Sequence, residues 1–273
     1  YWPAGSIYLG NKAKKIFKLP LFLDLRDLIS IQGQKKKIFL LNQLDKIFDK
    51  HLNKNVDLFL TVSPTCANKA RKFYNKKVLT VYNGMASEYD NDEKLKVNIK
   101  KKIKILYTGS LGITRNPKFF LNILNEYCKT NKIEVVVKFA SQDNPFDFID
   151  KKNIVFDMEW LGYLNKKQLK KEKDKSNVFL LIEDQTKNGN ENLTGKIFEY
   201  MLGKKPVMIS CHPNSDIVKV TKFTNSGMLI NSKKSLEVFF KSDFIVKKKK
   251  INLFSRKTQY ENLKKNILVF RDN

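Results

Sequence analysis

Two glutamates flank a polar, glycine-containing loop in the last third of the chain. Glu191 lies within the loop and Glu199 on the helix expected after it, with seven residues between them. The apolar run 178–182 comes just before the loop and predicts a buried parallel strand. Open α/β sheets bind ligands outside the carboxyl ends of their strands, and a helix that begins near residues 194–196 offers free N–H groups to an anion. The stretch therefore predicts an anion-binding site between two carboxylates.

Charged side chains also follow a second expected strand, at residues 19–25. Asp24, Arg26 and Asp27 lie where this strand ends. At that position they can point into a cleft, or an ion pair between Arg26 and one of the carboxylates can simply order the turn. The sequence leaves both alternatives open.

The composition limits the kinds of site that the chain can hold. Its 273 residues, 42% of them apolar, are enough for one large domain or two of ordinary size. The three cysteines are widely spaced without a Cys-x-x-Cys pair, and there are only two histidines. These counts argue against a disulfide framework and a zinc site, and they favour a reducing compartment. No Asp-x-Asp metal motif follows an expected strand, so we expect neither a metal nor a cofactor.

The start of the chain indicates a fragment. The sequence begins at Tyr1, without a methionine, in a segment that has the character of a domain interior. No signal peptide is visible, and no apolar run approaches the roughly 18 residues of a membrane-spanning helix. We therefore expect that the natural N-terminus lies upstream of Tyr1.

The formal net charge is +26, from 53 basic and 27 acidic residues. Such an excess can indicate nucleic acid, an anionic membrane surface or a phosphorylated substrate as partner. However, only five of the basic residues are arginine, and the lysines are scattered over every segment. Proteins that recognise nucleic acid concentrate arginine on phosphates and base edges. We favour a solvated basic surface with no specific nucleic-acid partner, and a polyanion-binding module is the less favoured alternative.

Residues 1–84 are predicted to form the second half of a Rossmann-like domain, which places its first half upstream. Apolar runs at 19–25, 56–62 and 77–82 alternate with helical segments. Strands that alternate with helices in this order indicate a parallel sheet. Three strands are about half of a complete doubly wound sheet.

Residues 34–52 are expected to form a basic amphipathic helix, because apolar residues recur at helical spacing opposite five lysines. Such a helix can lie on anionic lipid. More often it packs its apolar side on the sheet of its own domain, and this arrangement is our first expectation.

The remainder of the chain is predicted to hold a complete second domain. Residues 85–102 are polar and charged without apolar periodicity, so we predict a linker. From 103 to 253, about six expected parallel strands alternate with helices, which indicates a Rossmann-like domain. Residues 254–273 are expected to form a helix that can return to the first domain. The predicted fold class is α/β with two Rossmann-like domains, the N-terminal one incomplete.

Two such domains and a pair of glutamates at this spacing resemble the GT-B glycosyltransferases of family 4. Six segments, in order across nearly the whole chain, resemble motifs of that family. Three belong to its acceptor-side domain and three to its donor domain, which binds the nucleotide sugar: Leu23–Asp27, Thr61–Ser63, Val81–Gly84, Leu106–Leu111 with Arg115–Pro117, Trp160–Tyr163, and Gly195–Tyr200 with Gly203–Val207. Each is a weak indication alone, whereas six in order are specific.

The resemblance implies a role for each matching residue. Glu199 would accept hydrogen bonds from the ribose of the nucleotide sugar. Glu191, the implied catalytic residue, would lie near the transferring sugar. Arg115 stands where the family has a phosphate-binding cation, and a guanidinium suits a diphosphate. Gly109, in the turn 109–112, would let the backbone approach that diphosphate.

Other donor-binding positions follow from the same match. Ser110 stands where the family commonly has a second basic residue, so the site has one strong cation that Lys196 supplements. Backbone N–H groups at Thr194, Gly195 and Lys196 would stabilise charge on the leaving diphosphate without a metal.

The loop beside the nucleotide base is implied by a third match. Gly162 and Tyr163 would lie next to that base. We expect the neighbouring Trp160 in the core rather than stacked on the base.

The favoured prediction is a metal-independent glycosyltransferase of the hexosyl or N-acetylhexosaminyl type. The resemblance implies a nucleotide-sugar substrate, with a UDP-sugar favoured over a GDP-sugar. It also implies that no cofactor is needed and that the anomeric configuration is retained. The acceptor would be a saccharide or a lipid-linked saccharide in cell-envelope polysaccharide or lipopolysaccharide synthesis. That places the protein in the cytoplasm, with peripheral contact to the inner face of the cytoplasmic membrane. The alternative is a nucleotide-sugar epimerase of the same fold, for which Asp24 and Asp27 are the acid–base candidates.

Overall fold

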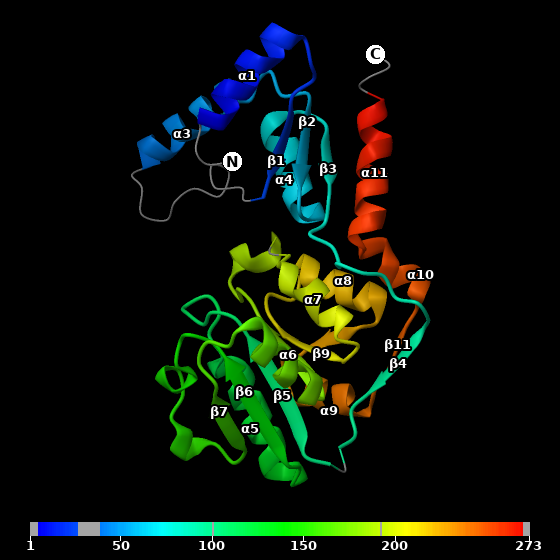
Figure 1. Cartoon of the computed structure of the whole chain (residues 1–273). Coiled ribbons are helices and arrows are strands. Elements are labelled where there is room, and N and C mark those ends of the chain that lie inside the picture. Colours follow the sequence, from blue (N-terminus) through cyan, green and yellow to red (C-terminus); the bar gives the residue numbers. More distant parts are fainter. Residues whose placement is uncertain (1–4, 27–38, 100, 192, 270–273) are drawn as a thin grey trace. The chain divides into compact units, whose positions relative to one another are not determined.

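The computed structural model describes residues 5–26, 39–99, 101–191 and 193–269 (Figure 1). The chain divides into two compact units, one formed by Tyr1–Asn83 with Lys257–Asn273 and the other by Gly84–Arg256. Parallel strands and helices build both units, which confirms the predicted α/β class. No helix in the described part is long and apolar enough to cross a membrane.

The first unit has a three-stranded parallel sheet in the order β1-β2-β3. These are the three strands that the apolar runs predicted. Side chains of the sheet pack with those of helix α4 around the buried Phe59. The ring of Phe59 stacks on the ring of Tyr74, with the ring centroids 4.4 Å apart. The elements of this unit are α1 (Gly5–Phe17), β1 (Phe22–Leu25), α3 (Phe39–Leu52), β2 (Leu58–Thr61), α4 (Pro64–Tyr74), β3 (Val78–Thr80) and most of α11 (Arg256–Leu268).

Helix α3 differs from its predicted orientation. Leu44, Ile47 and Phe48 were expected to pack on the sheet, but all three side chains are exposed. Instead Asp49 is buried, and its carboxylate accepts hydrogen bonds from the hydroxyl of Tyr74 at 2.5 Å and from a side-chain amide one helical turn further on. Burial raises the pKa of Asp49. A polar contact with α4, which the hydrophobic pattern does not reveal, therefore sets which side of α3 faces inward. Residues 34–38 of the predicted helix lie outside the described part.

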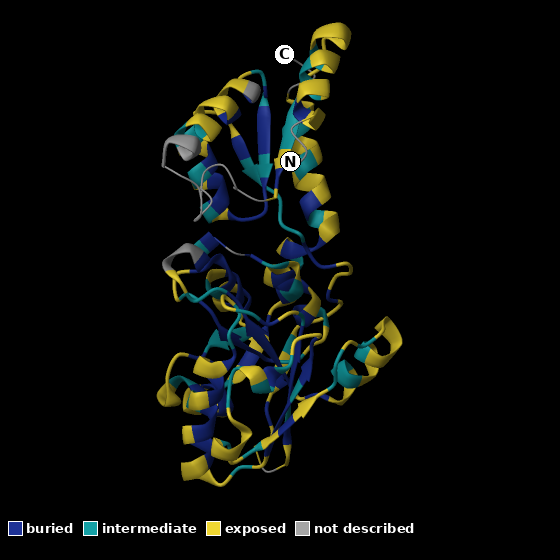
Figure 2. Ribbon diagram, turned by 90° about the vertical axis from the view of Figure 1, so that its left-hand side faces the viewer, coloured by how far each residue is buried: buried dark blue, intermediate teal, exposed yellow. Residues whose placement is uncertain are grey.

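The second unit is a complete Rossmann-like domain. Its six-stranded sheet is parallel throughout, in the order β10-β9-β8-β5-β6-β7, as the alternation of strands and helices predicted. Figure 2 shows the inner strands of this sheet buried between helices that are exposed on their outer sides, whereas the edge strands β7 and β10 are less covered. The strands are β5 (Ile103–Thr108), β6 (Val135–Ala140), β7 (Asp157–Trp160), β8 (Val178–Ile182), β9 (Val207–Ser210) and β10 (Gly227–Leu229).

Most helices of the second unit connect these strands, and α10 and η4 follow the last strand of the unit. Two of the helices, α5 and α9, pack on each other, with the rings of Tyr127 and Phe240 5.4 Å apart. The helices are α5 (Lys118–Asn131), η1 (Pro145–Asp147), η2 (Lys151–Asn153), α6 (Lys166–Lys175), η3 (Lys187–Glu191), α7 (Gly195–Leu202), α8 (Asp216–Thr224), α9 (Lys233–Lys241), α10 (Lys248–Ile251) and η4 (Asn252–Phe254).

The strand order reverses between β5 and β8. From β5 the chain proceeds outward through β6 and β7, and from β8 it proceeds outward in the other direction through β9 and β10. The loops that leave the carboxyl ends of β5 and β8 therefore diverge. Such a switch point is where open α/β sheets form their ligand crevice.

The predicted linker at 85–102 is instead part of the second unit. It contains β4 (Glu93–Lys96), which pairs antiparallel with β11 (Asp243–Val246), and neither strand was predicted. In β4 only Leu95 is buried between charged neighbours, so one apolar residue was too little pattern to reveal a strand. Tyr89 is also buried, and its hydroxyl donates to the carbonyl oxygen of Met201 at 2.5 Å.

A substitution at Gly203, which directly follows α7, tests how tightly this helix packs on β8. A Cβ atom at Gly203 would lie 2.3 Å from Cε2 of the buried Phe179. Because the surrounding core is filled, we expect Gly203→Ala to lower the free energy of unfolding by about 1–3 kcal/mol. Denaturant unfolding followed by circular dichroism measures this change. The matched control is Gly112→Ala, where no atom lies within 4 Å of the added Cβ; equal stability of the two variants would contradict the packing.

Candidate functional site

A cavity of about 340 Å³ lies at the switch point, at the carboxyl ends of β5 and β6. It brings together five of the residues predicted to bind the donor: Gly109, Ser110, Tyr163, Lys196 and Glu199. We call it the donor cavity. The other residues that line it are Thr108, Ala140, Ser141, Gln142, Leu164 and Leu169.

Lys196 lies directly over the backbone of Gly109. A Cβ atom at Gly109 would be 1.8 Å from Lys196 Nζ, and the φ of Gly109 is +121°, in the region that favours glycine. Lys196 Nζ also lies 5.7 Å from the centre of the Tyr107 ring. Burial lowers the pKa of Lys196, and the nearby Arg115 lowers it further, while Glu183 and Glu199 act in the opposite direction. The glycine thus makes room for a partly desolvated ammonium group at the edge of the cavity.

Arg115 is held from two sides. Its Nε donates to Glu183 Oε2 at 2.8 Å, and its NH1 donates to the hydroxyl of Ser110 at 3.2 Å. Glu183 directly follows β8 and is 2% exposed, and its Oε1 has no hydrogen-bond partner among the described residues. The predicted phosphate-binding cation is therefore fixed by a buried carboxylate beside Lys196.

Glu183 is the residue that the sequence interpretation missed. It is the first charged residue after the apolar run of β8, the same kind of position that drew attention to Asp24. The sequence interpretation relied on the glutamates at positions 191 and 199, whose spacing matches the family, and Glu183 has no place in that spacing.

The N-terminal end of α7 is fixed against β5. Thr194 caps the helix, and its side chain accepts from the N–H of Lys196 at 3.5 Å. Tyr200 is fully buried, and its hydroxyl bonds both the N–H and the hydroxyl of Thr108, at 3.0 and 2.9 Å. Its ring stacks on Phe179 of β8. These contacts place the N-terminal end of α7, which begins at Gly195, near the end of β5.

The two predicted glutamates have different environments. Glu199 lines the donor cavity, is exposed, and forms an ion pair with Lys173 of α6. Glu199 thus has an ion pair with a lysine and a position in the cavity at the same time. Glu191 is 2% exposed at the end of η3 and does not line the cavity. The structure therefore brings only Glu199 to this site.

The loop after β7 is only partly as expected. Gly162 has a φ of +63°, and the following Tyr163 is exposed at the donor cavity. The prediction that Trp160 belongs to the core is wrong, since its side chain is 45% exposed. Trp160 is exposed because β7 is the edge strand of the sheet, and its Nε1 donates to the carbonyl oxygen of Ser141 at 2.9 Å.

The predicted acceptor-side residues belong to the first unit. Arg26 donates to Asp24 at 2.8 Å and to the side chain of Asn83 at 2.6 Å. The bond to Asp24 is the ion pair that one of the two alternatives predicted. The bond to Asn83 connects the end of β1 with the segment after β3. Asp27 lies outside the described residues.

The described residues hold no group of three or more histidine, cysteine, aspartate or glutamate side chains that could bind a metal ion. Cys66, Cys128 and Cys211 are buried thiols that form no disulfide with one another. Burial raises the pKa of Cys128 to about 12 and that of Cys211 to about 11, which leaves both thiols protonated near neutral pH.

No protein-family model matches the sequence, and no curated protein matches it. Solved structures do match. The Anabaena protein Alr3699/HepE in complex with UDP superposes with a TM-score of 0.67 at 14% identity, over 97% of this chain and 77% of that chain. The lipopolysaccharide outer core galactosyltransferase WaaB gives 0.65 at 15% identity, over 97% and 73%. Sucrose-phosphate synthase from Thermosynechococcus elongatus gives 0.62 at 11% identity, over 98% and 72%.

These structures are GT-B glycosyltransferases, and the chain has their fold. The similarity covers both units, as the order of the six sequence motifs predicted. At identities of 11–15% the match defines the fold and no more, so membership of family 4 stays a prediction.

The pairing of Arg115 with Glu183 can be tested through stability. Arg115→Met leaves the buried carboxylate without its cation, and we expect the free energy of unfolding to fall by about 1–3 kcal/mol. A second substitution, Glu183→Gln, removes that charge, so the double variant should be more stable than Arg115→Met alone. Urea unfolding of both variants measures the difference.

The control is Lys241→Met, which breaks the exposed pair with Glu237 on α9 and should leave stability unchanged. If the double variant were no more stable than the single one, the carboxylate would not depend on Arg115.

Proposed function

We propose that the chain is a glycosyltransferase that binds a nucleotide sugar, with a UDP-sugar favoured, in the donor cavity. The observation that supports this most directly is the convergence of Gly109, Ser110, Tyr163, Lys196 and Glu199 on one cavity at the switch point. They come from three separate segments, and each occupies the position that the resemblance to GT-B enzymes assigns to a donor contact. Complexes of the structural neighbour HepE with UDP and with UDP-glucose support the same ligand class.

The diphosphate would bind to the cations at the edge of the cavity. Lys196 supplies an ammonium group, and Arg115, which bonds the lining residue Ser110, keeps part of its guanidinium available beyond its bonds to Glu183 and Ser110. The N-terminal end of α7 adds the partial positive charge of its helix dipole. When the bond between the sugar C1 and the phosphate oxygen breaks, negative charge develops on the diphosphate. Positive groups already fixed there would stabilise that charge in place of a metal ion.

The rest of the donor would lie towards Glu199 and Tyr163. In the proposal Glu199 accepts hydrogen bonds from the ribose and exchanges its pair with Lys173 for that contact. Tyr163, exposed beside Gly162, lies where the base would be. Retention of configuration and a role for Glu191 beside the sugar are implied by the resemblance alone, and we keep both as part of the proposal.

For the acceptor we propose a saccharide or a lipid-linked saccharide of the cell envelope, met at the inner face of the cytoplasmic membrane. The similarity to a lipopolysaccharide galactosyltransferase supports this class of acceptor. So do Leu44, Ile47 and Phe48 of α3, which present apolar side chains to solvent on a helix that also has Lys46 and Lys50. A hexosyl or N-acetylhexosaminyl group would be transferred.

Glu199→Ala tests the donor site. Loss of a charge-assisted hydrogen bond to the ribose should weaken UDP binding about 10–100-fold, with the fold unchanged by circular dichroism. Isothermal titration calorimetry with UDP measures the affinity. The matched control is Glu237→Ala, an exposed helical glutamate that is also paired with a lysine. Equal UDP affinity of the wild type and Glu199→Ala would contradict the assignment.

The lowered pKa of Lys196 predicts a pH dependence. Because burial depresses this pKa, the ammonium group loses its proton at a lower pH than an ordinary lysine does. UDP affinity should therefore fall as the pH rises through the lowered pKa. Lys196→Met should bind UDP more weakly at neutral pH and lack this fall. Calorimetric titrations between about pH 7 and 10 test both expectations, with Lys241→Met as the control that keeps the wild-type profile.

Product analysis separates glycosyl transfer from the alternatives. An epimerase would convert a UDP-sugar without any acceptor, whereas a transferase would release UDP only when an acceptor saccharide is added. Tight, steeply salt-dependent binding of DNA or RNA would instead indicate a polyanion-binding module.

A further inference from the structure

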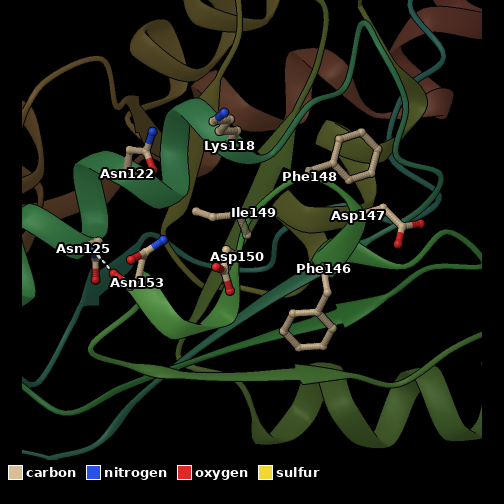
Figure 3. Close-up of a pocket in the computed structure, with 9 residues that line it drawn as sticks. All are labelled: Lys118, Asn122, Asn125, Phe146, Asp147, Phe148, Ile149, Asp150 and Asn153. Carbon is tan, nitrogen blue, oxygen red and sulfur yellow. Dashed lines mark hydrogen bonds between the residues drawn. The ribbon is translucent and has the colours of Figure 1, made fainter.

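The second unit contains another cavity, of about 580 Å³, which shares no lining residue with the donor cavity (Figure 3). Its volume lies within the roughly 300–1,000 Å³ that is typical of small-molecule sites. One wall is formed by α5, and the other by the connection between β6 and β7, which contains η1 and η2. The lining residues are Lys118, Asn122, Asn125, Phe146, Asp147, Phe148, Ile149, Asp150 and Asn153.

The wall on α5 is a polar stripe. Lys118, Asn122 and Asn125 are spaced by four and three residues, which places them on one face of the helix. Figure 3 shows Lys118 and Asn122 on successive turns above the cavity. Phe120 and Leu121 of the same helix are buried in the core. The polar residues are thus on the side of α5 that turns away from the core.

Asn125 fixes the two walls relative to each other. Its side chain is almost completely buried, its Nδ2 donates to the carbonyl oxygen of Asn153 at 2.7 Å, and its Oδ1 accepts from the N–H of Val155 at 2.9 Å. The first of these bonds is the dashed line in Figure 3. Both polar atoms of this amide are therefore occupied, and the cavity is held open by a buried structural contact.

Four other polar side chains around the cavity are available to a ligand. Lys118, Asn122, Asp147 and Asn153 have no side-chain hydrogen bond or ion pair with any residue that the structure describes. Together they offer ammonium and amide donors, and amide and carboxylate acceptors. They come from three segments, so they can contact a ligand from several directions.

Apolar surface lies beside these polar groups. Phe146, Phe148 and Ile149 are half-buried, and Figure 3 shows Ile149 in the middle of the cavity. One face of Phe146 is covered by Lys151, whose Nζ lies 5.5 Å from the ring centre. Phe148 and Ile149 supply the remaining apolar contact. A cavity with apolar surface and a few separate polar groups suits a ligand that has both kinds of surface.

The charge of the cavity distinguishes it from the rest of the protein. Lys118 is its one basic lining residue, against Asp147 and Asp150, so its formal charge is −1 in a chain of +26. Phosphorylated ligands would meet two carboxylates here and are disfavoured. The described residues also show no cluster of three acidic, histidine or cysteine side chains for a metal ion at this place. A neutral ligand fits this balance best.

We propose that this second cavity binds a neutral saccharide. Amide and carboxylate groups can bond adjacent hydroxyls as donors and acceptors, and the apolar side chains can pack on the C–H surface of a sugar ring. The biological role rests on the proposed function: Ser141 and Gln142 of the same β6–β7 connection line the donor cavity. A saccharide bound here would be held close to the place where the sugar is transferred. The binding itself does not depend on that function.

The test measures binding of uncharged sugars to the full chain without UDP. The probes are glucose, N-acetylglucosamine, maltose and cellobiose, studied by saturation-transfer NMR and calorimetry. At least one probe is expected to bind, and Asn122→Ala and Asp147→Ala are each expected to weaken it about tenfold. Neither substitution should change UDP affinity by more than about twofold, since neither residue lines the donor cavity. The matched controls are Asn262→Ala and Asp90→Ala, at exposed positions elsewhere.

Three results would overturn the proposal: no probe binds, both substitutions leave binding unchanged, or inorganic phosphate displaces the sugar. The same samples separate this proposal from the proposed function. Protein that binds a sugar but not UDP would refute only the donor site, and protein that binds UDP but no sugar would refute only the second cavity.

Discussion

The attachment of α7 to the carboxyl end of β5 is the contact on which the donor cavity depends. The hydroxyl of Tyr200 satisfies the N–H of Thr108 where the strand ends, and its ring lies against Phe179 of the neighbouring strand. An aromatic residue buried with its hydroxyl bonded fixes both position and rotation of a short helix. Lys196 and Glu199 lie on that helix, so the contact between Tyr200 and β5 also positions these two side chains at the cavity.

The effect of the positive charge of this chain depends on where the basic residues lie and not on how many there are. Most of its lysines lie on exposed surface, where ionic interactions are screened and weak. Beside the donor cavity, Lys196 is restrained by partial burial and Arg115 by its ion pair with Glu183. A cation with little freedom left loses less entropy when it binds an anion. A buried carboxylate can therefore assist the binding of a phosphate group indirectly, by holding the cation in place.

Much of this architecture was predictable from hydrophobic pattern, and the exceptions have physical causes. The inner strands β8 and β9 are continuous buried runs, because each is covered on both faces, whereas the edge strand β7 carries charged residues. The strand β4 was missed because three of its four residues are charged, and β11 because its four residues are too short a pattern to reveal a strand. The orientation of α3 depends on the buried Asp49. The exposure of Trp160 depends on the position of β7 at the edge of the sheet. Five residues that line the donor cavity could be named from the order of motifs, but Glu183 could not, since its contact with Arg115 joins residues 68 positions apart.

The connection between β6 and β7 has a consequence for how this protein can vary. Ser141 and Gln142 line one cavity, and residues from Phe146 to Asn153 line the other. Loops usually tolerate insertions and deletions, yet a change of length here would alter the lining of two cavities at once. Sequence drift in this segment is therefore constrained at both ends, and related chains should keep its length even where its residues differ.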